Sequence, residues 1–303
     1  MTYHGIIPPM VTPLTDRDAL DAAGLERLIE HILAGGVHGL FILGTTGEGP
    51  SLSYRLRREL IERTCRQVRR RVPVLVGITD TAFVESVNVA RWAADAGADA
   101  VVAAPPYYLA GGQSELFEYL EHLVPQLPLP LFLYNMPALT KVSFEVETVR
   151  RAMDNPRIIG LKDSSGNMIY FHRAVELLQH RPDWSLFIGP EEMTADAVLA
   201  GGHGGVNGGA NFYPRLYVDL YNAAKAGDMA RVRALHAEVM FISDNLYRIG
   251  RHSSAVIKGI KAALSILGVC DDFMAEPFRR FRDPQRAQVR AVLCRLNLAA
   301  ESP

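Results

Sequence analysis

The runs LPLFLYNM (residues 129–136) and IIGLKDS (residues 158–164) are short apolar segments with polar residues near one end. They do not alternate between apolar and polar residues, which is typical of strands that are covered on both faces. Such runs recur about eight times along the chain, with Gly, Pro, Thr or Asn at the junctions. The other six lie at residues 5–12, 38–45, 72–79, 100–107, 184–190 and 204–209.

Amphipathic segments separate these runs. In the first of them, one helical stripe is formed by Leu25, Leu28, Ile29, Ile32 and Leu33. The alternation indicates parallel β/α units, and eight units within about 225 residues favour an α/β fold, a (β/α)₈ TIM barrel. An open doubly wound sheet is the alternative, although no change in pattern marks a second half.

The chain becomes wholly helical after the eighth run. Three helical patterns and a final stripe follow: residues 217–226, 232–246 and 255–267, then Val289, Val292, Leu293 and Leu296. We therefore expect a barrel over residues 1–226 and a C-terminal helical extension over residues 227–303 that packs against it.

Composition excludes several classes of protein. The 303 residues are 49% hydrophobic and 21% charged, which is typical of a compact fold and not of a disordered chain. Thirty-two Lys and Arg against 33 Asp and Glu leave a net charge of −1, so nucleic acid and anionic membranes are not expected partners. No apolar run approaches the roughly 20 residues that cross a bilayer.

The N-terminus and the cysteines indicate the compartment. The opening MTYHGIIPPM has no basic region, apolar core and cleavage site of an export signal, so we expect a cytoplasmic protein. Cys65, Cys270 and Cys294 are an odd number at distant spacings, which predicts reduced core residues without a disulfide or a zinc site.

The active site of such a barrel lies at the carboxyl ends of its strands. The polar residues in these places are Thr12, Thr45, Thr46, Thr79, Asp80, Tyr107, Tyr108, Tyr134, Asn135, Lys162, Asp163, Glu191, Glu192 and Asn207. Lys162 is the most informative because it ends an apolar run. Partial burial would lower its pKa and give a neutral amine that can form a Schiff base. A lysine that reaches water or pairs with Asp163 is the structural alternative.

Three further groups have a functional and a structural interpretation. GTTGEG at residues 44–49 offers hydroxyls and N–H groups to a small carboxylate, or it is an ordinary turn before a helix. Tyr134 is a candidate for proton transfer, or it is a buried phenol held by backbone. Glu191 and Glu192 open a predicted helix, where they either cap it or accept hydrogen bonds from a polyhydroxylated substrate.

Four motifs taken together resemble one family: GTTGEG, PPYY at residues 105–108, YNMP at residues 134–137 and GLKD at residues 160–163. They are similar to the dihydrodipicolinate synthase / N-acetylneuraminate lyase family of pyruvate-dependent class I aldolases. The similarity runs from Gly5 to roughly Phe278. Four motifs in the family's order and spacing are far more specific than any one of them.

The resemblance implies roles for individual residues. Lys162 would form a Schiff base with the keto carbon of pyruvate or of another 2-keto acid. Thr45 and Thr46 would hold the carboxylate, and Tyr134 would relay protons through Thr45. Tyr108 would reach into the site of a neighbouring subunit, which implies an oligomer, usually a homotetramer built as a dimer of dimers.

The same resemblance extends to the substrate pocket. Gly189 and Val206 fall where the family lines the pyruvate pocket with backbone, and Asn207 follows directly. The partners would be pyruvate or another 2-keto acid and an aldehyde, and the chemistry would need no cofactor and no metal ion.

The choice of aldehyde is where the chain departs from the synthase branch. That branch typically has an Arg at the position of Leu139, where it pairs with the carboxylate of aspartate semialdehyde. The string YNMPALT is closer to sialic acid lyases and 2-keto-3-deoxy sugar acid aldolases, but Thr45 and Gly208 stand where the sialic acid lyases usually have Ser. We therefore expect reversible aldol cleavage of a 2-keto-3-deoxy sugar acid, with Glu192 among the groups that bind it.

Other functions remain open from the sequence. The alternatives within the family are 4-hydroxy-tetrahydrodipicolinate synthase with another basic group in place of the missing Arg, N-acetylneuraminate lyase, and a keto-deoxy sugar acid dehydratase. A small-acid binding barrel without catalysis is the alternative from another class. The joint presence of Lys162, Tyr134, Thr45, Thr46 and Tyr108 argues against it.

Overall fold

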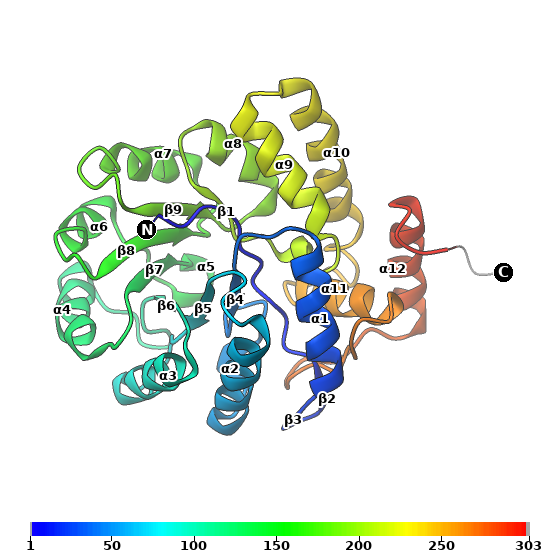
Figure 1. Ribbon diagram of the computed structural model, residues 1–303, viewed down its shortest axis with the longest axis horizontal. Coiled ribbons are helices and arrows are strands. Elements are labelled where there is room, and N and C mark those ends of the chain that lie inside the picture. The colour runs from blue at the N-terminus through cyan, green and yellow to red at the C-terminus, as the bar shows by residue number, and fades with distance from the viewer. Residues whose placement is uncertain (1, 301–303) are drawn as a thin grey trace.

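The protein is built around an eight-stranded parallel sheet in a computed structural model that describes residues 2–300 (Figure 1). The strand order is β1-β10-β9-β8-β7-β6-β5-β4. The strands are β1 (Gly5–Ile6), β4 (Leu40–Ile42), β5 (Val74–Gly77), β6 (Ala100–Ala103), β7 (Leu131–Asn135), β8 (Ile158–Asp163), β9 (Ser185–Ile188) and β10 (Gly204–Gly205). Each lies within one of the eight predicted runs.

The two ends of this strand order, β1 and β4, close the sheet into a barrel. Phe41 N donates to Pro8 O at 3.0 Å, and Met10 N donates to Phe41 O at 2.8 Å. His38 N also donates to Ile6 O at 2.8 Å. The predicted (β/α)₈ barrel is therefore confirmed, and the alternative of an open doubly wound sheet is wrong.

Helices surround the strands (Figure 1). They are α1 (Ala22–Ala34), α2 (Tyr54–Val68), α3 (Phe83–Ala96), α4 (Gln113–Leu123), α5 (Pro137–Thr140), α6 (Val146–Ala152), α7 (Met168–Leu177), α8 (Thr194–Leu199) and α9 (Pro214–Ala226). In α1, Leu28, Ile29 and Ile32 are fully buried, as the spacing predicts.

The C-terminal extension consists of α10 (Met229–Asn245), α11 (Ala255–Ile266) and α12 (Asp283–Arg295). In Figure 1, α10 lies beside α9 and α12 lies on the outer side of the molecule. Val289 and Leu293 of α12 are fully buried, so the last predicted stripe packs inward. The predicted boundary after residue 226 falls between α9 and α10, and it stays a prediction.

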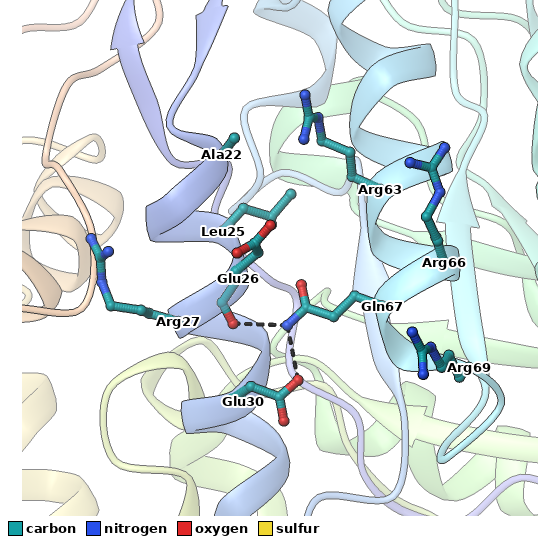
Figure 2. Close-up of a pocket in the computed structure, with 9 residues that line it drawn as sticks. All are labelled: Ala22, Leu25, Glu26, Arg27, Glu30, Arg63, Arg66, Gln67 and Arg69. Carbon is teal, nitrogen blue, oxygen red and sulfur yellow. Dashed lines mark hydrogen bonds between the residues drawn. The ribbon is translucent and has the colours of Figure 1, made fainter.

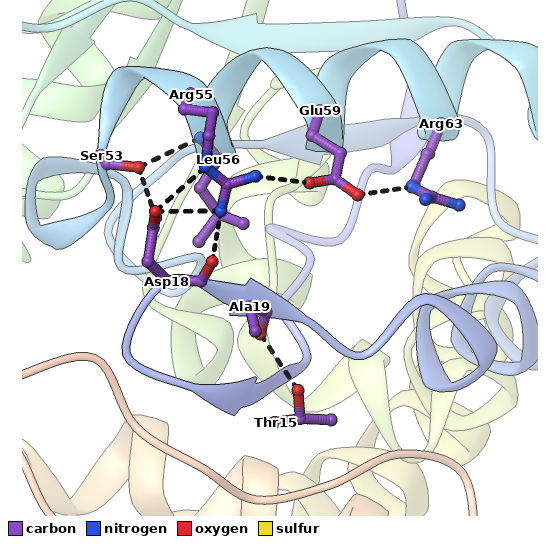
Figure 3. Close-up of polar contacts among 8 residues, drawn as sticks. All are labelled: Thr15, Asp18, Ala19, Ser53, Arg55, Leu56, Glu59 and Arg63. Atoms are coloured by element: carbon purple, nitrogen blue, oxygen red, sulfur yellow. Dashed lines mark hydrogen bonds and ion pairs between the residues drawn. The ribbon is translucent and has the colours of Figure 1, made fainter.

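A short hairpin, β2 (Leu14–Asp16) and β3 (Ala19–Leu20), contacts the start of α2. Figure 3 shows Asp18 accepting hydrogen bonds from Ser53 Oγ at 2.5 Å and Arg55 Nε at 3.0 Å. Ser53 also caps α2 by accepting from Leu56 N. The Ser53 and Arg55 hydrogen bonds lower the pKa of Asp18, but these groups are exposed, so the network adds little to stability.

The side chains of the strands divide into two layers. One faces the helices, and the other fills the barrel interior with Ile7, Phe41, Leu75, Ala100, Val102, Ala104, Phe132, Tyr134, Phe187 and Val206. The alternation within β6 and β7 places every second residue inside. Gly160 of the GLKD motif leaves room there, since a Cβ at this position would lie 2.2 Å from the Phe132 ring.

Two further sequence expectations concern membranes and cysteines. Within residues 2–300, helices long and apolar enough to cross a membrane are absent. The three cysteines are free, but only Cys270 is buried, because Cys65 and Cys294 are partly exposed. The expectation that all three are core residues is confirmed for Cys270, whereas Cys65 is partly buried against the core and Cys294 is partly exposed.

Candidate active site

Lys162 lies near the carboxyl end of β8 and points into the barrel. Its register partners are Tyr134 of β7 and Phe187 of β9. The residue is only 6% exposed, and its side-chain nitrogen lies 4.0 Å from the ring centroid of Tyr134 and 5.0 Å from that of Phe41. Burial lowers the pKa of Lys162, because the ammonium loses its hydration. The alternative of a lysine that reaches water does not fit this burial.

Tyr134 is the polar neighbour of Lys162. Its hydroxyl lies 3.3 Å from Thr45 Oγ1, and either oxygen can donate. Burial alone would raise the pKa of Tyr134, but the positive charge of Lys162 and hydrogen bonds from Thr45 and Ser164 lower it below its usual value. Lys162, Tyr134 and Thr45 therefore form one connected cluster, as the resemblance implies.

The GTTGEG segment forms a tight turn after β4. Glu48 N donates to Thr45 O at 3.0 Å, and Gly49 N donates to Gly44 O at 3.2 Å. Thr45 and Thr46 are half-buried. Within residues 2–300, the N–H groups of Thr45, Thr46 and Gly47 donate to no other group of the protein. Free N–H groups beside two hydroxyls form a suitable place for a carboxylate.

Several polar strand-end residues hold the loops together instead of facing the cluster. Asn135 Nδ2 donates to Asp163 Oδ1 at 2.9 Å, which joins the ends of β7 and β8. Burial raises the pKa of Asp163, although Asn135 and Ser165 oppose this effect. Thr12 Oγ1 donates to Gly47 O at 2.7 Å, and Thr79 Oγ1 accepts from Ala104 N at 2.9 Å.

Asp80 also has a structural partner. Arg57 Nη1 forms a buried ion pair with its Oδ2 at 2.9 Å, and the Tyr54 hydroxyl donates to the same oxygen at 3.0 Å. Burial would raise the pKa of Asp80, but the Ala82 N–H and these two side chains hold it below its usual value.

Tyr108 lies apart from the cluster within its own chain. It is 89% exposed and has a φ of 76°, in the left-handed region that non-glycine residues rarely adopt. Leu109 beside it is 81% exposed. Backbone strain that presents an aromatic ring to the outside points to a functional constraint at this residue.

The residues expected to line the pocket sit on the loops after β9 and β10. Gly189 N donates to Asp163 O at 2.7 Å, and a Cβ on Gly189 would collide with Ser164 Oγ at 1.9 Å. Val206 packs into the barrel interior with Tyr134. Asn207 is buried: Nδ2 donates to Thr194 Oγ1 at 2.9 Å, while Oδ1 has no partner among residues 2–300.

Glu191 and Glu192 begin a 3₁₀ turn, Glu191–Met193, that runs into α8. Glu191 accepts hydrogen bonds from Gly209 N at 2.8 Å, from the Tyr247 hydroxyl at 2.8 Å and from the Tyr217 hydroxyl. Burial raises the pKa of Glu191 to about 7, although the three donors oppose the shift. Glu192 accepts from Ser243 Oγ at 2.5 Å. Both carboxylates thus face the C-terminal half of the chain, and substrate binding by Glu192 stays a prediction.

Leu139 lies on α5, the single-turn helix that directly follows β7. Its side chain is 52% exposed, so no packing against the interior accounts for it. Lys141 is the nearest basic residue along the chain, and its Nζ donates to Ala138 O at 3.3 Å.

Sequence reasoning missed an ion pair behind the GTTGEG turn. Glu48 pairs with Lys261 of α11, and both side chains are buried. The apolar surroundings of Lys261 in the sequence offered one signal, because a lysine on a buried helix face requires a partner.

An open groove of about 620 Å³ lies between α1 and α2 (Figure 2). Arg27, Arg63, Arg66 and Arg69 line it together with Glu26 and Glu30, and Gln67 bridges the two helices. These residues lie on helices outside the barrel, and the groove contains none of the strand-end candidates.

Residues 2–296 match the model of the Dihydrodipicolinate synthetase family. The chain belongs to this family. Members of this family are pyruvate-dependent class I aldolases, so the protein is an enzyme, a carbon–carbon lyase.

Similar proteins cover almost the whole chain. The 4-hydroxy-tetrahydrodipicolinate synthase of Methanopyrus kandleri is 31% identical over 300 residues, which are 98% of each chain. A dihydrodipicolinate synthase structure from Bacteroides thetaiotaomicron is 58% identical, with a TM-score of 0.94 over 97% of this chain and 98% of that one. YagE of Escherichia coli, a dihydrodipicolinic acid synthase family member in complex with pyruvate, is 30% identical, with a TM-score of 0.93 over 99% of this chain and 100% of that one.

Proposed function

We propose that Lys162 forms the Schiff base with pyruvate and that Tyr134 and Thr45 carry the protons of the reaction. The contacts of Lys162 support this proposal. Its side chain is buried, its pKa is lowered, and Tyr134 lies beside it. The Tyr134 hydroxyl in turn forms a hydrogen bond with Thr45 Oγ1. A neutral amine attacks a keto carbon, whereas an ammonium ion cannot.

The steps balance with these groups. The Lys162 nitrogen adds to the keto carbon, and the carbinolamine hydroxyl takes a proton from Tyr134 and leaves as water, so that an iminium ion and a phenolate remain. The phenolate takes a methyl proton, and the resulting enamine attacks the aldehyde carbon. The new alkoxide takes this proton from Tyr134, with Thr45 sharing the proton, and the water that hydrolyses the iminium returns a proton to Tyr134. Hydrolysis then frees Lys162, and the reverse sequence cleaves a 2-keto acid.

The turn at Thr45 and Thr46 provides the place for the carboxylate of pyruvate. Its N–H groups and hydroxyls would hold the anion beside Lys162, with backbone at Gly189 and Val206 lining the opposite side. Tyr108 would complete the proton path in a neighbouring subunit, which accounts for its strained and exposed position. This arrangement implies a homotetramer, a dimer of dimers.

For the aldehyde we favour a neutral hydroxyaldehyde, so that the product is a 2-keto-3-deoxy sugar acid. Leu139 offers no charge to an acceptor carboxylate, so this position does not favour a charged aldehyde over a neutral one.

The second candidate is 4-hydroxy-tetrahydrodipicolinate synthase, and the names of the relatives support it better than they support a sugar acid aldolase. In this case Lys141, two residues beyond Leu139, is a basic group that could replace the missing Arg. N-acetylneuraminate lyase and a keto-deoxy sugar acid dehydratase gain no support from these names.

Two measurements test the proposal. Borohydride reduction in the presence of pyruvate should add one reduced pyruvate per chain, on the peptide that contains Lys162; a label on another lysine, or none, would refute the Schiff base. Initial rates with pyruvate and either aspartate semialdehyde, glyceraldehyde or glycolaldehyde then separate the two candidates. A clear preference for the semialdehyde would establish the synthase.

A further inference from the structure

The GTTGEG turn is tied to the C-terminal extension by a buried carboxylate. The Glu48 side chain is 1% exposed and that of Lys261 is 0% exposed. Glu48 Oε2 accepts from Ala275 N at 2.8 Å. Oε1 pairs with the Lys261 ammonium, and among residues 2–300 it accepts no hydrogen bond from any other group. Lys261 Nζ also donates to Phe273 O at 2.7 Å.

The backbone of Glu48 closes the turn that forms the proposed carboxylate site. Its N–H closes the turn by donating to Thr45 O at 3.0 Å, and its φ of 55° is left-handed. Leu43, at the start of the turn, also has a left-handed φ of 59°. Left-handed conformations at non-glycine residues persist only where the surroundings hold them. The contacts of the Glu48 side chain with Lys261 and Ala275 stabilise this conformation at one end of the turn.

Burial of an ion pair in an apolar interior costs free energy, because both charges lose their hydration. Well-packed apolar residues in its place are often as stable or more stable, so stability alone does not account for the pair. The pair fixes the orientation of the Glu48 side chain. Its carboxylate has two partners, Lys261 and Ala275 N, and both come from the C-terminal extension.

We propose that Glu48 and Lys261 are positioning residues, whose buried ion pair holds the Thr45–Thr46 turn in the geometry that receives the substrate carboxylate. This inference rests on the proposed function, because it assigns the turn to pyruvate. Neither side chain touches the reacting atoms; both act through the backbone of the turn.

The test uses the full-length protein with both charges removed together, since one unpaired buried charge could prevent folding. In Glu48→Gln/Lys261→Met, the amide can still accept from Ala275 N and Met fills the space of the lysine stem. Leu293→Ala is the matched control, because it weakens the same extension through the buried face of α12 without touching the turn.

Two measurements should separate positioning from mere stability. The pyruvate concentration for half-maximal borohydride trapping should rise roughly tenfold in the double variant, with less than about a threefold change in the trapping rate at saturation. Without pyruvate, hydrogen exchange at Glu48 N–H and Gly49 N–H should also accelerate roughly tenfold. Leu293→Ala should change neither.

The proposal is overturned if the double variant folds and keeps wild-type half-saturation, or if exchange in the turn is unchanged. Failure of the wild type to trap pyruvate would instead refute the proposed function. The exchange measurement needs no substrate, so it decides the positioning of the turn in either case.

Discussion

The side-chain nitrogen of Lys162 lies 4.0 Å from the ring centroid of Tyr134, and the two residues are register partners on β8 and β7. Each changes the acidity of the other. Burial lowers the pKa of Lys162, and the charge and hydrogen bond of Tyr134 oppose this shift. A positive charge on the Lys162 nitrogen, as ammonium or as iminium, lowers the pKa of Tyr134. The electrostatics of the pair therefore suit proton release at the stage when the iminium ion exists.

The first prediction concerns the pH dependence of imine formation. The pKa of Lys162 is lowered from 10.5, and the neutral amine is the reactive form, so its fraction rises with pH and reaches one half below pH 10.5. The rate of borohydride-trapped adduct formation should show a midpoint below that value. Lys162→Ala should form no adduct, and a wild-type midpoint at or above pH 10.5 would contradict the assignment.

Removal of the Tyr134 hydroxyl separates proton transfer from packing. Tyr134→Phe keeps the ring against Lys162, so turnover should fall by about 10²–10⁴-fold, with a smaller change in pyruvate trapping. Tyr170→Phe is a suitable control, since the Tyr170 hydroxyl is buried without a partner among residues 2–300. A loss of less than about threefold in Tyr134→Phe would leave Tyr134 a packing residue.

The choice of aldehyde should change with residue 139. In Leu139→Arg, activity with neutral hydroxyaldehydes should fall and activity with aspartate semialdehyde should rise, because a guanidinium can pair with the acceptor carboxylate. Leu139→Met, which keeps an uncharged side chain of similar volume, should change neither. The measurement is the ratio of kcat/KM values for the two aldehydes. An unchanged ratio in Leu139→Arg would show that residue 139 does not select the substrate.

Removal of the positive charge of Lys141 provides a second test that distinguishes the two candidate functions. If the protein is a synthase, Lys141→Met should raise the KM for aspartate semialdehyde roughly tenfold or more, since a charge-assisted hydrogen bond to the carboxylate is lost. If the acceptor is a neutral hydroxyaldehyde, as we favour, the same substitution should leave its KM within about twofold. Urea denaturation of both proteins would exclude an effect on stability.

The carboxyl group of Glu191 should make stability depend on pH. Its pKa rises from 4.5 to about 7 on folding, so the folded protein holds the proton more tightly than the unfolded chain. The resulting stabilisation is complete below pH 4.5 and is lost as pH rises through 7, a change of about 3 kcal/mol in the free energy of unfolding. Glu191→Gln should flatten this dependence in urea titrations. Glu192→Gln should reduce this dependence only in part, because the charge of Glu192 is one of the smaller causes that raise the pKa of Glu191. A wild-type slope in Glu191→Gln would exclude Glu191 as its source.

The fold could be predicted from the sequence because each strand is covered on both faces and therefore reads as an unbroken apolar run. The lengths of the strands could not be predicted in the same way. The run at residues 5–12 contains only the two-residue β1, because Pro8 and Pro9 have no N–H to donate to a neighbouring strand. The run at residues 204–209 likewise contains only β10 before a 3₁₀ turn, Gly208–Asn211.

For the site, the positions of Lys162, Tyr134 and the GTTGEG turn could be predicted because each lies at or just beyond the carboxyl end of a strand. The contacts of the Glu191 carboxylate could not be predicted. The partners of Glu191 are Tyr217 and Tyr247, which in the sequence are ordinary members of amphipathic helices. Periodicity predicts that such side chains are buried, but it does not predict which distant carboxylate they meet.

The closure of the barrel between β1 and its two neighbours has a consequence for the newly made chain. β1 pairs on one side with β10, roughly 200 residues later, and at a synthesis rate of about 5–20 residues per second this partner follows after roughly 10–40 seconds. For that time the first strand has one edge without hydrogen-bond partners, which favours association with other chains. Ala275 and Lys261, which hold the turn that contains Thr45, leave the ribosome later still. The earliest part of the protein to be synthesised is thus among the last to become functional, and a chain interrupted after Lys162 would contain the proposed Schiff-base lysine without a completed site.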